Sequence, residues 1–375
     1  MQTTSSPSCR LCGRALPSQA LLHYRNMPAA AQHLPGPEDL AHDHGIDLVI
    51  KQCPACGLVQ LDAEPVAYYR EVIRASGVSG ELKDFYTRRL AAFAQRYGLG
   101  GKAVLEAGCG EGTYLECINA AGMRGFGVEA GANNLRQCAE RGLNVSECFF
   151  DTPLDLPNAP FAAFFMFNFL EHIPDPRGYL LHLADHLTDD AVGLVEVPSF
   201  SMMQRQALYT EFIADHLCYY TPETLGRLVE LCGFSMLECE HVRDDYVLAA
   251  TLRKRPRLVL DDSNVQRNAA AMDSFIAAHG NLAVWGAGHQ AFTLLALCRN
   301  PAGVNCIIDS APFKQGRFAP VTHIPIVSPA SIGQRGIRNI LVIAGSYSQE
   351  IANLIKRQYP EIQAFLLNDD GSIRA

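Results

Sequence analysis

A glycine-rich loop carries the clearest chemical signature in the sequence. The stretch VLEAGCGEGTYLE (104–116) passes from strand-forming residues through Gly108, Gly110 and Gly112 to residues that favour a helix from about Thr113. Glycine permits positive φ and lets a ligand lie against the main chain, and a helix N-terminus offers unpaired N–H groups. The loop suits a dinucleotide or S-adenosylmethionine, and alone it leaves both open.

Acidic residues near the loop favour S-adenosylmethionine. Glu106 precedes the glycines, where a carboxylate attracts a cationic methionine amino group and repels a pyrophosphate. Glu129 ends the second strand and is placed to accept hydrogen bonds from both ribose hydroxyls. Asp151 follows the third strand, where it can face the adenine amino group. The expected cofactor site, at the carboxyl edge of the sheet, comprises Glu106, Gly108, Gly110, Gly112, Glu129, Asp151 and Asn168.

Two C-x2-C pairs predict a structural zinc site. Each pair is followed directly by a glycine, which lets the turn direct backbone N–H groups at the sulfurs. Four thiolates satisfy tetrahedral zinc, and reduced cysteines without a metal are the alternative. The predicted ligands are Cys9, Cys12, Cys53 and Cys56. Six other cysteines lie in apolar patterns and are expected to be buried: Cys117, Cys138, Cys148, Cys232, Cys298 and Cys306.

Composition restricts the kind of partner and the compartment. The formal net charge of −8 argues against nucleic acid as the main partner. No apolar run approaches the roughly 18 residues of a membrane span. The N-terminus lacks the charged and apolar regions of an export signal. We therefore expect a cytoplasmic protein with a small-molecule substrate and no nucleic-acid or membrane partner, as a monomer or homodimer.

Alternating strands and helices position these residues. From residue 103 the pattern predicts a parallel sheet with right-handed crossovers, after helices in 67–100. A charged, proline-containing segment, RKRPR (253–257), precedes a second alternating unit. The fold class is therefore α/β, and the expected domains are a zinc-binding module (1–66), a nucleotide-type α/β domain (67–257) and a C-terminal Rossmann-like domain (258–375).

Several motifs together resemble those of one enzyme family. They are CRLCG…CPACGLVQL, LEAGCGEGTYL, GFGVEAG, NFLEHIPDP, ADHLCYYTPETL, VWGAGHQAFTLLALC and IIDSAPFKQGRFAPVTHIPI. The chain resembles the sugar C-methyltransferases, class I S-adenosylmethionine-dependent enzymes that act on nucleotide-linked 4-keto deoxysugars. The resemblance implies a zinc module, a central methyltransferase domain and a C-terminal domain that helps to hold the nucleotide-sugar.

C-methylation beside a ketone requires a base that removes an α-proton, so that the enolate can attack the methyl group. His172 follows the fourth strand, and Asp215 precedes His216 in the crossover after the fifth, where the acid could orient an imidazole. The resemblance places histidines and an acid at these three positions. It also places a tyrosine where this chain has Ile213, and the candidate replacements are Tyr209, Tyr219 and Tyr220.

The second glycine loop is a weaker signal. Gly286 and Gly288 follow a strand, but Ala291 occupies the third glycine position of a dinucleotide fingerprint. Asp309 ends the next strand, as an NAD site requires. The resemblance instead implies substrate contacts, for which the candidates are His289, Lys314 and Arg317. Two alternatives stay open: an O- or N-methyltransferase on a sugar or small metabolite, and an NAD-dependent oxidoreductase or nucleotide-sugar-binding module.

Overall fold

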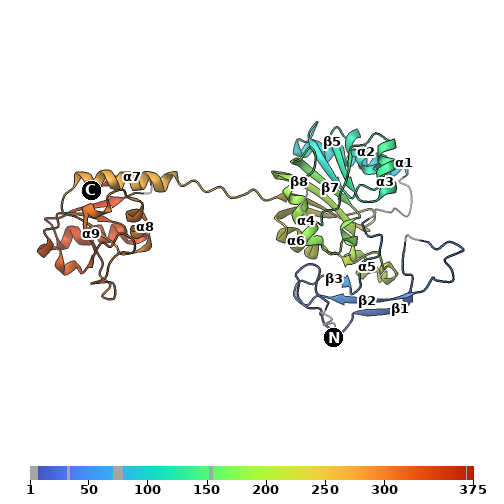
Figure 1. The fold of residues 1–375 in the computed structure, drawn as a ribbon, viewed down its shortest axis with the longest axis horizontal. Helices are drawn as coiled ribbons and strands as arrows, with labels where there is room; N and C mark the ends of the chain where they lie inside the picture. The colour runs from blue at the N-terminus through green and yellow to red at the C-terminus, as the bar shows by residue number, and fades with distance from the viewer. Residues whose placement is uncertain (1–6, 32–33, 71–78, 152–154, 369) are drawn as a thin grey trace. The chain divides into compact units, whose positions relative to one another are not determined.

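The computed structural model describes residues 7–31, 34–70, 79–151, 155–368 and 370–375. The chain divides into two compact units, Met1–Arg257 and Leu258–Ala375 (Figure 1). The expected separation of the first unit into a zinc module and a methyltransferase domain stays a prediction. The helical positions expected at Val72 and Ile73 lie outside the described residues.

A seven-stranded sheet forms the core of the first unit. Its strand order is β10-β11-β8-β7-β4-β5-β6, and only β11 runs opposite to the others. The bounds are β4 Ala103–Ala107, β5 Arg124–Glu129, β6 Val145–Glu147, β7 Phe161–Phe167, β8 Leu187–Pro198, β10 Phe234–Val242 and β11 Val247–Lys254. The α/β class is confirmed. Because β4 lies between β5 and β7, the order in which successive strands join the sheet reverses beside the glycine loop, and open α/β sheets bind ligands at such a point.

Helices cover both faces of this sheet. Buried residues of α1 (Gly80–Tyr97) and α2 (Thr113–Ala120) pack on one face, and those of α4 (Pro176–Asp185) and α6 (Pro222–Leu231) pack on the other. The remaining helices of the unit are α3 (Ala132–Glu140) and α5 (Phe200–Gln206). Thr221 caps α6, and Pro222 occupies its first turn, where its missing N–H has no cost. No helix in the described ranges is both long and apolar enough to cross a membrane.

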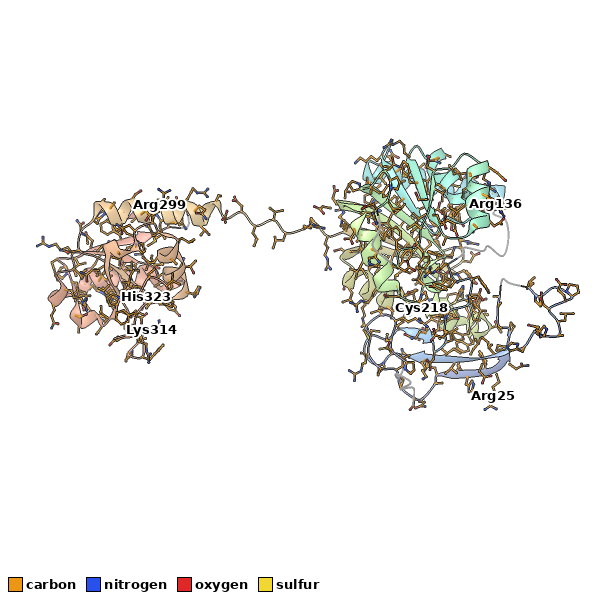
Figure 2. All side chains as sticks on the ribbon, in the orientation of Figure 1. Arg25, Arg136, Cys218, Arg299, Lys314 and His323 are labelled. Carbon is orange, nitrogen blue, oxygen red and sulfur yellow. The ribbon has the colours of Figure 1, made fainter. Side chains whose placement is uncertain are left out.

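A four-stranded antiparallel sheet joins the cysteine-rich region to the methyltransferase core. Its order is β1-β2-β3-β9, with bounds Leu22–Met27, Ile46–Gln52, Val59–Leu61 and Cys218–Tyr219. Leu48, Ile50 and Leu61 of this sheet share a hydrophobic cluster with Phe200 and Phe212. Figure 2 shows Cys218, on β9, between the large sheet and strands β1 to β3. The strand β9, which directly follows His216, is therefore held by the cysteine-rich region.

The second unit is another α/β sheet. Its strand order is β14-β13-β12-β15-β16-β17, with only β17 antiparallel. The strands are β12 Leu282–Trp285, β13 Val304–Ile308, β14 Ile326–Val327, β15 Asn339–Val342, β16 Gln363–Leu367 and β17 Ile373–Arg374, and the helices are α7 Ser263–Ala278, α8 His289–Leu297 and α9 Ser348–Gln358. The predicted Rossmann-like alternation is present.

Candidate functional site

The glycine loop after β4 is buried and adopts a conformation that favours glycine. Gly108, Gly110 and Gly112 all have positive φ, of 71°, 55° and 85°. A Cβ on Gly108 would lie 2.5 Å from the Phe169 ring, so a larger residue would displace that ring. Only glycine meets both demands without strain.

Glu129 holds the glycine loop in place. Its Oε2 accepts the Gly110 N–H at 2.8 Å, and its Oε1 accepts the N–H groups of Ala130 (3.1 Å) and Gly131 (2.8 Å). Contact of this carboxylate with a ribose stays a prediction. Glu106, one strand away, is fully buried. Two carboxylates at adjacent strand ends suit a cationic nucleoside rather than a pyrophosphate.

We expect Glu129→Gln to weaken S-adenosylhomocysteine binding by about 10- to 100-fold, the cost of losing one or two hydrogen bonds to a charged group. The amide retains the shape but turns one acceptor into a donor that faces backbone N–H groups. Isothermal titration calorimetry measures the change. The control is Glu147→Gln, an exposed position on β6. If the two variants bound S-adenosylhomocysteine with equal affinity, Glu129 would not be part of the cofactor site.

The other expected cofactor residues lie nearby with partners of their own. Asp151 forms an ion pair with Arg70, at 2.5 Å, so it is not open to an adenine group alone as the sequence implied. Asn168 follows β7 with φ of 49°, and its N–H donates to the Glu196 carbonyl at 2.8 Å. Contact of either side chain with the cofactor stays a prediction.

His172 and His216 lie side by side. His172 ends a short 3-10 turn, Leu170–His172, that follows β7, and its ring centroid is 4.8 Å from that of His216. The Nδ1 of His172 donates to the Asp215 carbonyl at 2.8 Å. Because a carbonyl only accepts, the proton is fixed on Nδ1 and the lone pair on Nε2. Of the two nitrogens of the His172 ring, Nε2 is therefore the one that can accept a proton.

The carboxylate of Asp215 does not orient an imidazole, which corrects the expectation from sequence. Its Oδ1 accepts from the Tyr68 hydroxyl at 2.7 Å, and its Oδ2 accepts the Ala31 N–H at 2.8 Å. The main-chain carbonyl of the same residue holds His172 instead. Asp215 therefore ties two distant segments to the loop that carries His216.

Tyr68 is the functional candidate that sequence reasoning missed. Of the three tyrosines considered as replacements at Ile213, Tyr219 bonds the Ile213 main chain and Tyr220 is buried. Tyr209 lies on the surface, 37% exposed. Tyr68 lies 147 positions before Asp215, and no motif or spacing joins the two residues. Only the folded chain brings this hydroxyl to the cluster.

Burial controls the charge of the cluster. Desolvation lowers the pKa of His216 to about 3 and also lowers the pKa of His172, where the Asp215 carbonyl acts in the opposite direction. Desolvation raises the pKa of Glu171, beside His172, to about 8. Because burial penalises the charged form, all three side chains favour their neutral states.

The four predicted zinc ligands converge. Cys9 Sγ lies 3.4 Å from Cys56 Sγ, and Cys12 Sγ lies 3.5 Å from Cys53 Sγ. Zinc–sulfur bonds of about 2.3 Å place tetrahedral sulfurs roughly 3.8 Å apart, so the cluster accommodates zinc with small adjustments. The glycines after each pair have φ of 74° and 83°, the left-handed turn expected for them. These residues fit a structural ion, and zinc as its identity stays a prediction.

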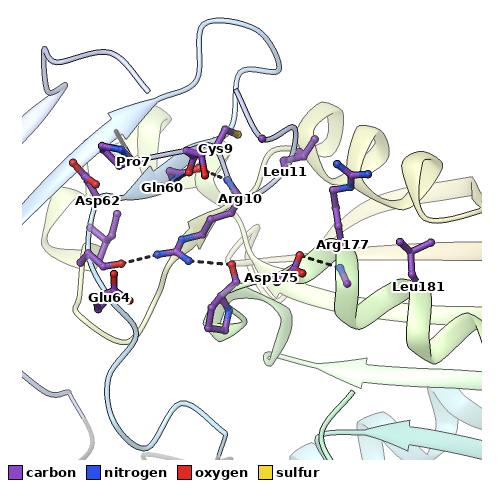
Figure 3. A pocket seen from close by; sticks show the side chains of 16 residues that line it. Pro7, Cys9, Arg10, Leu11, Gln60, Asp62, Glu64, Asp175, Arg177 and Leu181 are labelled. Atoms are coloured by element: carbon purple, nitrogen blue, oxygen red, sulfur yellow. Dashed lines mark hydrogen bonds between the residues drawn. The ribbon is translucent and has the colours of Figure 1, made fainter. Parts of the chain in front are cut away.

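Arg10, between the first two cysteines, fastens this region to the methyltransferase core. Its guanidinium donates to the Pro174 carbonyl at 3.0 Å and to the Ala63 carbonyl at 2.6 Å, and its N–H donates to Gln60 at 3.0 Å (Figure 3). The residues joined by these bonds line part of a pocket of about 840 Å³. Pro174 lies two residues after His172, so Arg10 helps to fix the end of the candidate site.

We expect Arg10→Ala to lower the free energy of unfolding by about 2–4 kcal/mol, because two charge-assisted hydrogen bonds are lost and their acceptors stay partly buried. Denaturant unfolding of the full chain measures this. Arg14→Ala, at an exposed position of the same loop, is the matched control and should change stability by less than about 0.5 kcal/mol. A small effect at Arg10 would show that the contact is dispensable.

The second unit presents its candidate residues differently from expectation. Lys314 pairs with Asp309 at 2.9 Å, so its charge is already matched, and Arg317 donates to the Phe313 carbonyl. Asp309 also accepts the Ala287 N–H of the glycine loop at 2.9 Å. His289 begins α8. Lys314 lies on the opposite side of the unit from Arg299 (Figure 2). Substrate contact by these residues stays a prediction.

Comparison with known families defines the class of protein. A methyltransferase-domain model matches residues 78–239, and a model of the C-methyltransferase C-terminal domain matches residues 263–365. The chain is an S-adenosylmethionine-dependent methyltransferase, and its large sheet has the class I methyltransferase fold that the sequence predicted. The pairing of the two domains supports a C-methyltransferase family.

Individual relatives are distant. The chain is 22% identical to C-methyltransferase NovU of Streptomyces niveus over 382 residues, which cover 92% of this chain and 90% of NovU. Among solved structures, an S-adenosylmethionine-dependent methyltransferase from Clostridium acetobutylicum is 13% identical with a TM-score of 0.40, and covers 46% of this chain and 92% of its own. The CcbJ methyltransferase of Streptomyces caelestis is 16% identical with a TM-score of 0.40, at 50% and 95% coverage.

Proposed function

We propose that this enzyme transfers a methyl group to the carbon beside the ketone of a nucleotide-linked keto-deoxysugar. The observation that carries the proposal is the imidazole of His172, whose Nε2 lone pair is fixed by the Nδ1–H bond to Asp215 at the carboxyl edge of β7. The glycine loop follows the adjacent strand β4. The similarity to NovU, which is named a C-methyltransferase, spans nearly the full chain and supports carbon as the acceptor.

His172 is proposed to take the α-proton. When bound, S-adenosylmethionine supplies a methyl group on a good leaving group, so the protein needs to orient the acceptor and manage one proton. Nε2 accepts that proton, and the Asp215 carbonyl keeps the ring from rotating. The imidazolium formed would stabilise the enolate beside it in a site of low polarity. Tyr68 and Ala31 position Asp215, and thereby His172, through its carboxylate.

Solvent deuterium exchange tests the chemistry apart from methyl transfer. The full-length enzyme is incubated in deuterium oxide with S-adenosylhomocysteine and a nucleotide-linked 4-keto-6-deoxyhexose, and exchange at the carbons beside the ketone is followed by NMR. We expect enzyme-dependent exchange well above the rate of a sample without enzyme. Methyl transfer to the sugar without any exchange would contradict C-methylation and favour the O- or N-methyltransferase alternative, which needs no α-proton base.

A further inference from the structure

A second group of metal-ligand side chains lies in the methyltransferase unit. Glu171 and His172 come from the 3-10 turn after β7, and His216 comes from the loop before β9. One potential ligand atom from each of the three lies within 4.8 Å of the others. In the described part of the chain, the only other group of this kind is the four-cysteine cluster.

The Glu171 carboxyl group is buried with one of its oxygens unpaired. The residue is 1% exposed, and within the described residues its Oε2 has no hydrogen-bond partner. Its Oε1 lies 3.8 Å from His172 Nε2, beyond hydrogen-bond distance. A buried carboxyl group without a partner is costly, and a cation placed between it and the two imidazoles would remove that cost.

His172 is oriented as a ligand. His172 donates its Nδ1–H to a main-chain carbonyl, which is the arrangement that orients metal-binding histidines and leaves Nε2 as the donor atom. The His172 side chain is 17% exposed, so an ion can reach it. Metal–ligand bonds of about 2.0–2.2 Å place ligand atoms roughly 3.4 Å apart. The ligand atoms, which lie within 4.8 Å of one another, would have to approach by up to about 1.4 Å to satisfy this geometry.

We propose that Glu171, His172 and His216 form a binding site for one divalent transition-metal ion. Two imidazoles and one carboxylate favour zinc, cobalt or nickel over magnesium and calcium, which prefer oxygen ligands. Three protein ligands leave at least one coordination position to water. This site is separate from the cysteine cluster and has a different donor set.

The proposed ion would compete with the proton for His172 Nε2. If His172 is the base of the proposed function, the metal-bound enzyme cannot remove the α-proton, and micromolar transition metal should inhibit methyl transfer reversibly. This consequence rests on the proposed function, whereas the binding itself does not. Metal binding measured without cofactor or acceptor therefore separates the two proposals.

Cobalt titration tests the site directly. The full chain without a histidine tag is first loaded with one equivalent of zinc, which the four thiolates bind in preference to the second site, and Co²⁺ is then added while heat and visible absorption are recorded. We expect one Co²⁺ per chain with weak bands of a nitrogen and oxygen site and no thiolate-to-cobalt charge-transfer band. Glu171→Gln and His216→Gln should each weaken this binding at least tenfold. The control His182→Gln, a histidine outside the group, should not.

Two results would overturn the proposal. One is a zinc-loaded protein that takes up no Co²⁺, or takes it up only with a thiolate charge-transfer band. The other is Co²⁺ binding by Glu171→Gln as tight as by His182→Gln. Thermal unfolding of each variant establishes that it is folded, and if His216→Gln fails to fold, the isosteric Glu171→Gln decides.

Discussion

Replacing His172 with glutamine is expected to lower kcat for methyl transfer by about 10²- to 10⁴-fold, the usual contribution of a positioned general base. Glutamine keeps a donor near the Asp215 carbonyl but cannot take up a proton. The Kd of S-adenosylhomocysteine should stay within about twofold, because the residues that hold the glycine loop are untouched. Single-turnover methyl transfer and calorimetry measure the two quantities.

The control for this variant is His182→Gln. His182 also donates from Nδ1 to a main-chain carbonyl, that of Phe150, but it lies on α4 outside the cluster. Its replacement should leave kcat within about twofold. A His172→Gln enzyme that retains the wild-type rate would show that another group removes the proton, or that none needs to be removed.

Loss of the metal ion predicted at the four cysteines is expected to have the largest effect on stability. Cys53→Ser should abolish zinc binding at the four cysteines and lower the Tm by more than about 10 °C, since structural zinc sites contribute several kcal/mol to folding. The cysteines share one hydrophobic core with Leu217 and Cys218, and the Leu217 N–H donates to the Glu171 carbonyl at 2.8 Å. Disorder at the four cysteines would therefore extend through this hydrogen bond to the turn that carries His172.

Cys306→Ser provides the matched control for this prediction. Cys306 is fully buried in the second unit, which does not contain the four-cysteine cluster, so its replacement tests the serine substitution itself. Zinc content should stay at one per chain, as measured by elemental analysis. Equal thermal shifts for the two variants, or a Cys53→Ser protein that keeps its zinc, would contradict a structural metal at the four cysteines.

Local signals made much of the fold predictable from sequence. The glycine loop, the caps at Asp175 and Thr221 and the strand ends at Glu129 and Asn168 depend on residues close together in the chain. Each signal has a local physical cause, such as positive φ or an unpaired helix N–H, so composition and spacing reveal it. The predicted α/β class followed from these signals.

Long-range pairing was not predictable in the same way. The strand β9 covers only two residues, Cys218–Tyr219, and its sequence looked like the approach to a helix. It is a strand because β3 pairs with it. Likewise, Tyr68 and Ala31 meet Asp215 only after the cysteine-rich region has folded against the larger sheet. No single-sequence pattern joins segments separated by 147 and 184 positions.

Whether a candidate residue already forms an ion pair with another side chain was also not visible in the sequence. Lys314 looked available for a diphosphate, but Asp309, five positions away, neutralises it. Asp151 looked available for adenine, but Arg70 from before the first helix pairs with it. The pairing of Asp151 with Arg70 joins segments far apart in the sequence, whereas that of Lys314 with Asp309 is local and depends on how the loop after β13 folds.

The most direct measurement is the position of the transferred methyl group. S-adenosylmethionine labelled with ¹³C at the methyl group is reacted with a nucleotide-linked 4-keto-6-deoxyhexose, and the product is assigned by NMR. We expect the label on a carbon adjacent to the ketone, with a correlation from its protons to the carbonyl carbon. A label on oxygen or nitrogen, or cofactor binding without transfer to any keto-sugar in a panel of nucleotide handles, would contradict carbon methylation of a nucleotide-linked ketosugar.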